Sequence, residues 1–148
     1  MRRLKVKHVH AIYWIATLLF VMPQGWSAVQ YLTEAPRMTQ TITDLGYPEY
    51  FMAILGVAKL LGIAAIVTGL SPTLKEWAYA GFTFEVCGAF ASHMSAGDSL
   101  AVALVPIGFL AVQLISYFAW RHLRGDVRSR RSPYSYRGRG RGMAESAA

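Results

Sequence analysis

Two charged residues stand inside long apolar stretches of the sequence, where an ionisable side chain is costly to bury. Lys59 lies 13 residues before Pro72 and Glu85 lies 13 residues after it, so two antiparallel helices joined at Pro72 would bring both to a similar depth. An unpaired charge at the centre of a spanning helix costs about 2.5 to 3.5 kcal/mol on insertion scales. The spacing therefore predicts an ion pair between Lys59 and Glu85.

Two interpretations of this pair stay open. In one, Lys59 and Glu85 belong to a proton path or line a polar pocket for a small ligand. In the other, they form an interhelical clamp that fixes how two helices pack. Glycines lie close to both residues in the sequence: Gly56, Gly62, Gly81 and Gly88. Small residues at such spacing predict that the two helices approach each other closely.

His93 is the third candidate site residue, eight positions after Glu85 and about 80° around a helix from it. A histidine is suited to relay protons or to hydrogen-bond a quinone head group. The alternative is an ordinary polar side chain near a helix end, with Asp98 beyond it. The other histidines and the single Cys87 show no metal-ligand spacing and no CxxC pair. No metal, cofactor or catalytic residue is therefore predicted, and the sequence leaves enzymatic activity undecided.

The composition indicates a membrane protein. Hydrophobic residues make up 54% of the 148 residues and the mean hydropathy is +0.31, more than one soluble domain of this size needs. The formal net charge of +7 comes from basic residues concentrated at the two ends of the chain. That pattern is typical of membrane topology and not of a nucleic-acid-binding surface. The bilayer is the predicted partner, and no specific nucleic acid is.

Apolar segments divide the chain into its elements. A bilayer is crossed by roughly 20 residues of helix, and four segments satisfy this length: residues 11–32, 50–70, 77–96 and 100–120. The third is the weakest by hydropathy because it contains Glu85, Ser92 and His93. The predicted fold class is all-α, a bundle of four transmembrane helices.

The first segment also has features of a secretory signal peptide, because basic residues precede it and Ser27 and Ala28 lie near its end. Trp26 is too bulky for a position where cleavage requires a small residue. Apolar residues also continue beyond Ala28. Both observations favour a helix that is retained as an anchor.

The distribution of Lys and Arg predicts both termini on the cytoplasmic side, because these residues resist translocation. Four precede the first segment, eight follow the last from Arg121 onward, and Lys75 lies in the loop expected between the second and third segments. The long loop between the first two segments has only one. Within it, the spacing of Met38, Ile42 and Leu45 predicts a short amphipathic helix on the membrane surface, and an ordinary loop is the alternative.

The C-terminal tail differs in composition from the rest of the chain. It is rich in Arg, Gly, Ser and Tyr, and its few apolar residues predict disorder. The sequence thus divides into a transmembrane domain, residues 1–122, and a disordered cytoplasmic tail, residues 123–148. Beside a membrane, the arginines favour contact with anionic lipids over nonspecific binding of RNA.

An ordered set of short motifs runs along residues 11–121. The motifs are Leu45-Gly46-Tyr47-Pro48, Leu55-Gly56, Lys59-Leu60-Leu61-Gly62, Leu74-Lys75-Glu76-Trp77-Ala78-Tyr79-Ala80-Gly81-Phe82, Gly88-Ala89, Ser92-His93 and Gly97-Asp98. Together they resemble the DoxX-like family of small membrane proteins. The resemblance implies a four-helix bundle in the bacterial inner membrane. It also implies a link to the wider DoxX and DoxD group, whose members are associated with membrane oxidoreductase systems, including thiosulfate-to-quinone electron transfer and oxidative-stress complexes.

Two classes of function are therefore expected. The chain is an accessory subunit of a membrane redox system, with a quinone-sized pocket lined by Lys59, Glu85 and His93, or it is a small-solute or proton-coupled carrier. A structural scaffold is the plain alternative. The expected partners are the lipid bilayer, other membrane redox subunits or a quinone, and a second copy in a homo-oligomer.

Overall fold

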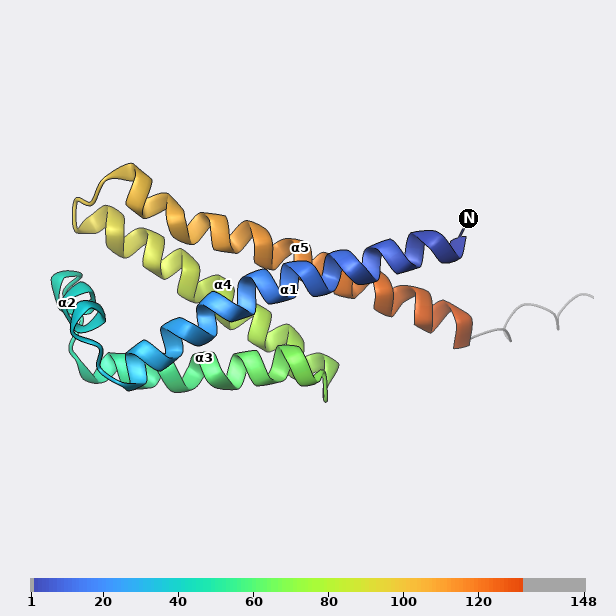
Figure 1. The fold of residues 1–148 in the computed structure, drawn as a ribbon, viewed down its shortest axis with the longest axis horizontal. Helices are drawn as coiled ribbons and strands as arrows, with labels where there is room; N and C mark the ends of the chain where they lie inside the picture. Colours follow the sequence, from blue (N-terminus) through green and yellow to red (C-terminus); the bar gives the residue numbers. More distant parts are fainter. Residues whose placement is uncertain (1, 132–148) are drawn as a thin grey trace, which may run out of the picture.

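The computed structural model describes the backbone of residues 2–131 and the side chains of residues 6–125. Within this range the chain forms five helices and no strand (Figure 1): α1 Arg2–Leu32, α2 Pro36–Asp44, α3 Tyr50–Thr68, α4 Pro72–Ser95 and α5 Leu100–Arg131. The predicted all-α class is confirmed. Met1 and residues 132–148, which include most of the tail predicted to be disordered, lie outside the described residues.

Four of these helices pack as a bundle (Figure 1). α1 packs against α3 and α5, α4 packs against the same two helices, and the contact between α3 and α4 is the least extensive of the four. The start of α1 and the end of α5 lie at the same end of the bundle as the turn between α3 and α4, here named the turn end. α2 and the connection between α4 and α5 lie at the opposite end, the α2 end.

The turn between α3 and α4 consists of residues that stop one helix and start the next. Gly69 follows α3 with φ of +60°, a left-handed conformation that glycine adopts without strain. Ser71 then caps α4, because its hydroxyl accepts a hydrogen bond from the Leu74 amide at 3.4 Å, and Pro72 occupies the first turn. The expected start of this segment at residue 77 is therefore too late. Pro72 is the first residue of α4.

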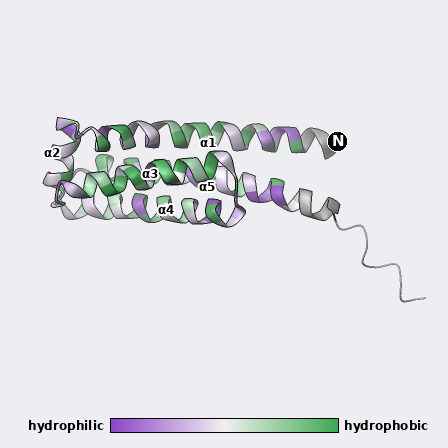
Figure 2. Cartoon of the chain, turned by 90° about the horizontal axis from the view of Figure 1, so that it is seen from below, coloured by the Kyte–Doolittle hydropathy of each residue, from purple (hydrophilic) through white to green (hydrophobic). Residues whose placement is uncertain are grey.

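Hydropathy separates α4 from the other bundle helices. Among the described residues, three helices are long and apolar enough to cross a membrane, over Val6–Leu32, Tyr50–Thr68 and Leu100–Gly125. α4 is not one of them, so the predicted count of four spanning helices is not confirmed. Figure 2 shows hydrophilic positions spread along α4, whereas α3 is largely hydrophobic. α4 coincides with the predicted segment of weakest hydropathy.

The short helix predicted in the first long loop is present as α2. Ile42 is buried, and Met38 and Leu45 on the same side are half-buried. Pro36 occupies its first turn, where a missing amide hydrogen costs nothing. α2 packs against α1, so its apolar side covers the end of the bundle.

The core of the bundle combines aromatic packing with buried hydroxyl groups. One buried cluster comprises Phe20, Ile66, Tyr79 and Phe82. The rings of Phe20 and Phe82 meet edge to face, with centroids 5.0 Å apart. Beside them, Ser116 Oγ lies 2.7 Å from Thr17 Oγ1 and 2.7 Å from the Tyr79 hydroxyl. Lipid tails are as apolar as leucine, so close packing and such hydrogen bonds hold helices together in a membrane.

The last helix continues further than its apolar segment. α5 reaches Arg131, past the expected end at residue 120 and past the proposed domain boundary at residue 122. Arg121 donates a hydrogen bond to the Tyr117 hydroxyl at 3.1 Å, and Arg124 lies over the Trp120 ring. These contacts one turn apart stabilise helix beyond the apolar residues. The division into two domains stays a prediction.

Candidate functional site

The two central charges lie together in the structure. Lys59 Nζ is 2.5 Å from Glu85 Oε1, and the same Nζ donates a hydrogen bond to Gln24 Oε1. The three side chains come from α1, α3 and α4, and we name them the polar triad. Lys59 is only 4% exposed, whereas the Glu85 side chain is 22% exposed. The ammonium group is therefore enclosed, and its counterion stays accessible.

Further contacts stabilise the charge of Lys59. Its Nζ lies 5.5 Å from the centre of the Tyr31 ring, a distance at which a cation and a ring attract each other. A charge-assisted hydrogen bond to a carboxylate is shorter and stronger than one between neutral groups. Together the carboxylate, the amide of Gln24 and the ring offset part of the cost of burying an ammonium group.

The glycines near the ion pair play different roles. A Cβ atom at Gly62 would lie 2.7 Å from the Phe82 ring, so α3 and α4 do approach closely there. A Cβ atom at Gly56 would lie 2.7 Å from Leu32, so this glycine allows close approach to α1 instead. Gly81 and Gly88 have no atom within 4 Å of an added Cβ. The expectation of close helix approach is wrong for these two, because they face open space.

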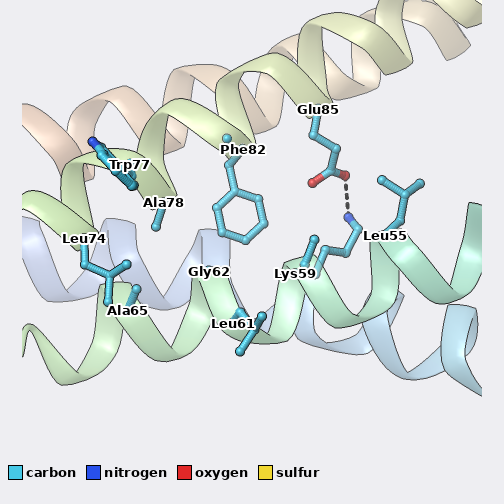
Figure 3. A pocket seen from close by; sticks show the side chains of 12 residues that line it. Leu55, Lys59, Leu61, Gly62, Ala65, Leu74, Trp77, Ala78, Phe82 and Glu85 are labelled. Atoms are coloured by element: carbon cyan, nitrogen blue, oxygen red, sulfur yellow. Dashed lines mark hydrogen bonds and ion pairs between the residues drawn. The ribbon is translucent and has the colours of Figure 1, made fainter.

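A cleft of about 360 Å³ lies between α3 and α4, and both residues of the ion pair line it. Small residues leave this space: Ala58, Gly62, Ala65, Ala78 and Gly81. Figure 3 shows Glu85 and Lys59 at one end of the cleft and Leu74 and Trp77 towards the other. Leu61 and Trp77 line the cleft and are exposed on the outside of the bundle. The cleft therefore joins an apolar outer surface to one charged pair.

His93 lies apart from this cleft. Its Nδ1 is 2.6 Å from Asp98 Oδ2, at the connection between α4 and α5. Eight residues of helix separate it from Glu85, about 12 Å at the rise of an α-helix. His93 is not among the residues that line the cleft, so the structure brings together two of the three site residues expected from the sequence. Among the described residues, no group of three or more His, Cys, Asp or Glu side chains could hold a metal ion.

A second buried lysine was missed in the sequence. Lys75 was expected in a loop, but it lies in the first turn of α4 and is 4% exposed. Its Nζ donates to the Tyr13 hydroxyl at 2.6 Å and to the Ile66 carbonyl at 2.7 Å. It also lies 4.9 Å from the centre of the Tyr13 ring and 5.3 Å from that of Trp120. The signal was its spacing, because Lys75 is four residues before buried Tyr79 on one helix face.

A comparison with family models identifies the chain. The model of the DoxX-like family matches residues 15–116, which include every residue of the polar triad. The chain belongs to the DoxX-like family. No curated protein and no solved structure matches it. The family and the three apolar helices together indicate a membrane protein.

Proposed function

We propose that the chain is an integral protein of the bacterial inner membrane and an accessory subunit of a quinone-linked redox system. In this proposal α1, α3, α4 and α5 all cross the bilayer and both termini are cytoplasmic. The excess of Lys and Arg near the two ends of the chain supports the orientation. The start of α1 and the end of α5 lie at the same end of the bundle, as an even number of crossings requires.

The length and burial pattern of α4 support its place as a fourth crossing. Its 24 residues span about 36 Å at 1.5 Å per residue, more than the roughly 30 Å of the hydrocarbon core. Its polar residues lower its hydropathy, but Lys75 is buried inside the bundle and Glu85 is paired with Lys59. The outward side chains Trp77 and Phe84 are apolar. α4 therefore presents an apolar surface to lipid despite its composition.

The class of ligand is inferred from the cleft, which leads from the lipid-facing surface to one charged pair. An isoprenoid chain fits an apolar groove lined by Leu61, Leu74 and Trp77. At its inner end, Lys59 is able to donate a hydrogen bond to a quinone carbonyl, and Glu85 is able to accept one from a quinol hydroxyl. The partial exposure of Glu85 allows this contact without breaking the bond between Lys59 and Gln24. A partner subunit transfers the electrons, and this chain binds and orients the ligand.

Quenching of tryptophan fluorescence by a short-chain ubiquinone analogue tests the proposal. Trp77 lines the cleft, so a quinone bound there quenches its emission, and Trp77→Phe removes that part of the signal. Gly81→Leu fills the cleft without a clash, because Gly81 lines it and has open space around it. The expected result is a loss of affinity of about tenfold or more, equal to roughly 1.4 kcal/mol.

Gly88→Leu is the matched control for this experiment. It adds the same side chain to the same helix at a position that is equally open but does not line the cleft. Its affinity for the analogue should equal that of the wild type. Equal binding by both variants, or no saturable quenching by the wild type, would overturn the proposal.

A further inference from the structure

The surroundings of the polar triad differ in the two directions along the bundle. Towards the turn end, each of the three helices places a large apolar side chain one turn from its triad residue. Phe20 is four residues before Gln24, Ile63 is four after Lys59, and Phe82 is three before Glu85. We name these three side chains, Phe20, Ile63 and Phe82, the apolar layer.

The apolar layer is closely packed. Phe20 is fully buried and Phe82 is 4% exposed, and their rings meet edge to face. Ile63 packs against this cluster and also approaches α1, where its Cδ1 would lie 3.7 Å from a Cβ at Gly25. The Phe82 ring contacts the backbone of Gly62 so closely that even a methyl group there would clash. Such packing closes the interior of the bundle between the triad and the turn end. The cleft between α3 and α4 passes this layer along Gly62 and Phe82, towards Leu74 and Trp77.

Towards the α2 end the same helices place small residues and then hydroxyl groups. Ala28 follows Gln24 by four residues, and Ala89 follows Glu85 by four. One turn further on α4 is Ser92, whose Oγ lies 2.7 Å from the Tyr47 hydroxyl. Both Tyr47 and Ser92 are half-buried, so this pair of hydroxyls lies between the interior and the surface.

Tyr31 adds a further hydroxyl-bearing side chain from α1 on this side of the triad. Its ring lies 5.5 Å from Lys59 Nζ, and it follows Gln24 by seven residues, two helical turns. α3 contributes the half-buried Leu55 at this level. The polar groups next to the ion pair on the α2 side are therefore hydroxyls, which both donate and accept hydrogen bonds.

We infer that water and protons reach the Lys59–Glu85 pair from the α2 end of the bundle and not from the turn end. The cleft is a separate route, because its lining by Leu61, Leu74 and Trp77 suits an apolar chain and not water. Which side of the membrane supplies the water and protons rests on the proposed function, in whose orientation the α2 end faces outwards. Protons that a bound ligand releases to the Glu85 carboxylate then leave on the outer side.

Cysteine accessibility in sealed vesicles tests the inference without any quinone. In a Cys87→Ala background, Ala89→Cys and Ala78→Cys are compared, because both alanines are half-buried and lie on the side of α4 that carries Glu85. Ala78 lines the cleft and Ala89 does not, so the pair compares the cleft with the α2 side as routes for water. A membrane-impermeant methanethiosulfonate is added from one side at a time. Thr41→Cys on α2 and Thr73→Cys at the start of α4, both exposed, report which side is reached.

Ala89→Cys should react from the side that labels Thr41→Cys, at least ten times faster than Ala78→Cys from either side. Ser92→Cys is a near-isosteric change closer to the surface and should react from the same side. It replaces Ala89→Cys in the experiment if that variant does not fold. The inference is overturned if Ala78→Cys reacts from the side that labels Thr73→Cys as fast as Ala89→Cys does. It is also overturned if Ala89→Cys is unreactive in folded protein. If the quinone analogue fails to bind, the proposed function is wrong, but the labelling result still tests this inference.

Discussion

Two lysines, Lys59 and Lys75, are buried to the same extent in this small bundle, yet they are held in different ways. Each is 4% exposed. Lys59 pairs with a carboxylate that stays partly accessible in a cleft, whereas Lys75 is held by a phenol, a backbone carbonyl and two aromatic rings. Among the described side chains, no carboxylate lies within 4 Å of Lys75 Nζ. A counterion that a ligand can reach is therefore the feature that separates a candidate site from a structural contact.

The role of Lys75 follows from its partners. The Ile66 carbonyl belongs to the last turn of α3, where backbone acceptors lack a partner within the helix. Lys75 satisfies this acceptor from the first turn of α4 and so ties the two helices together at their turn. Lys75 does not line the cleft, and none of these partners carries a charge.

Replacing Lys59 by Met should give the largest loss of stability. It leaves the Glu85 carboxylate without its cation, which costs about 3 to 5 kcal/mol for a dry buried pair and less to the extent that water reaches Glu85. Glu85→Gln should also destabilise, and the double variant should lose clearly less than the sum of the two. Unfolding by SDS in mixed micelles measures all three. Additive losses would show that the two side chains do not interact.

Replacing Lys75 by Met should cost less. The variant leaves the Tyr13 hydroxyl and the Ile66 carbonyl without a donor, a loss of about 1 to 3 kcal/mol, and no carboxylate is stranded. Combined with Glu85→Gln, the losses should add, because the two sites share no partner. The same unfolding measurement checks this. A coupling between Lys75 and Glu85 as large as that of the Lys59–Glu85 pair would show that the two lysines do not differ in this way.

Ser116→Ala should have a smaller effect that is confined to the turn-end half of the bundle. It removes the hydroxyl that joins Thr17 and Tyr79, and interhelical hydrogen bonds in membranes are worth about 0.6 kcal/mol on average and up to roughly 1.7. Quinone binding should not change. A variant that keeps its stability but loses quinone binding would show that the ligand contacts the hydroxyl groups of Thr17, Ser116 and Tyr79 and not the cleft.

Removing residues 132–148 should have the smallest effect. Their composition, with three arginines and no Val, Ile, Leu, Phe or Trp, gives them little to contribute to a packed bundle. The unfolding midpoint and the level of membrane insertion of a chain that ends at Arg131 should match those of the full chain. Degradation of the truncated chain in cells would assign the tail a structural role.

Part of this arrangement could be predicted from the sequence. The equal spacing of Lys59 and Glu85 from Pro72 predicted their contact, because a short turn forces adjacent helices to run antiparallel. Continuous apolar runs likewise predicted α3 and α5. The start of α4 was predicted too late because proline occurs both after the end of one helix and in the first turn of the next. The loop position predicted for Lys75 followed from that error.

Other parts depend on how the helices pack and have no local signature. Gln24 joins the triad only because α1 lies against α3, and hydrophobic periodicity does not specify which helices become neighbours. Gly62 and Gly81 have the same residue type but opposite surroundings, one against the Phe82 ring and one facing open space. The cleft therefore appears only in three dimensions, as does the separation of His93 from the ion pair.

The central claim is that the Lys59–Glu85 pair receives the polar group of a ligand and is more than a clamp between helices. The double variant Lys59→Met with Glu85→Gln tests this most directly, since it removes both charges and leaves neither stranded. Its affinity for the short-chain ubiquinone analogue is measured by tryptophan quenching in the same micelles in which its unfolding is followed. The account predicts a protein that is folded and loses about tenfold or more in affinity. A folded double variant that binds the analogue as tightly as the wild type would contradict it.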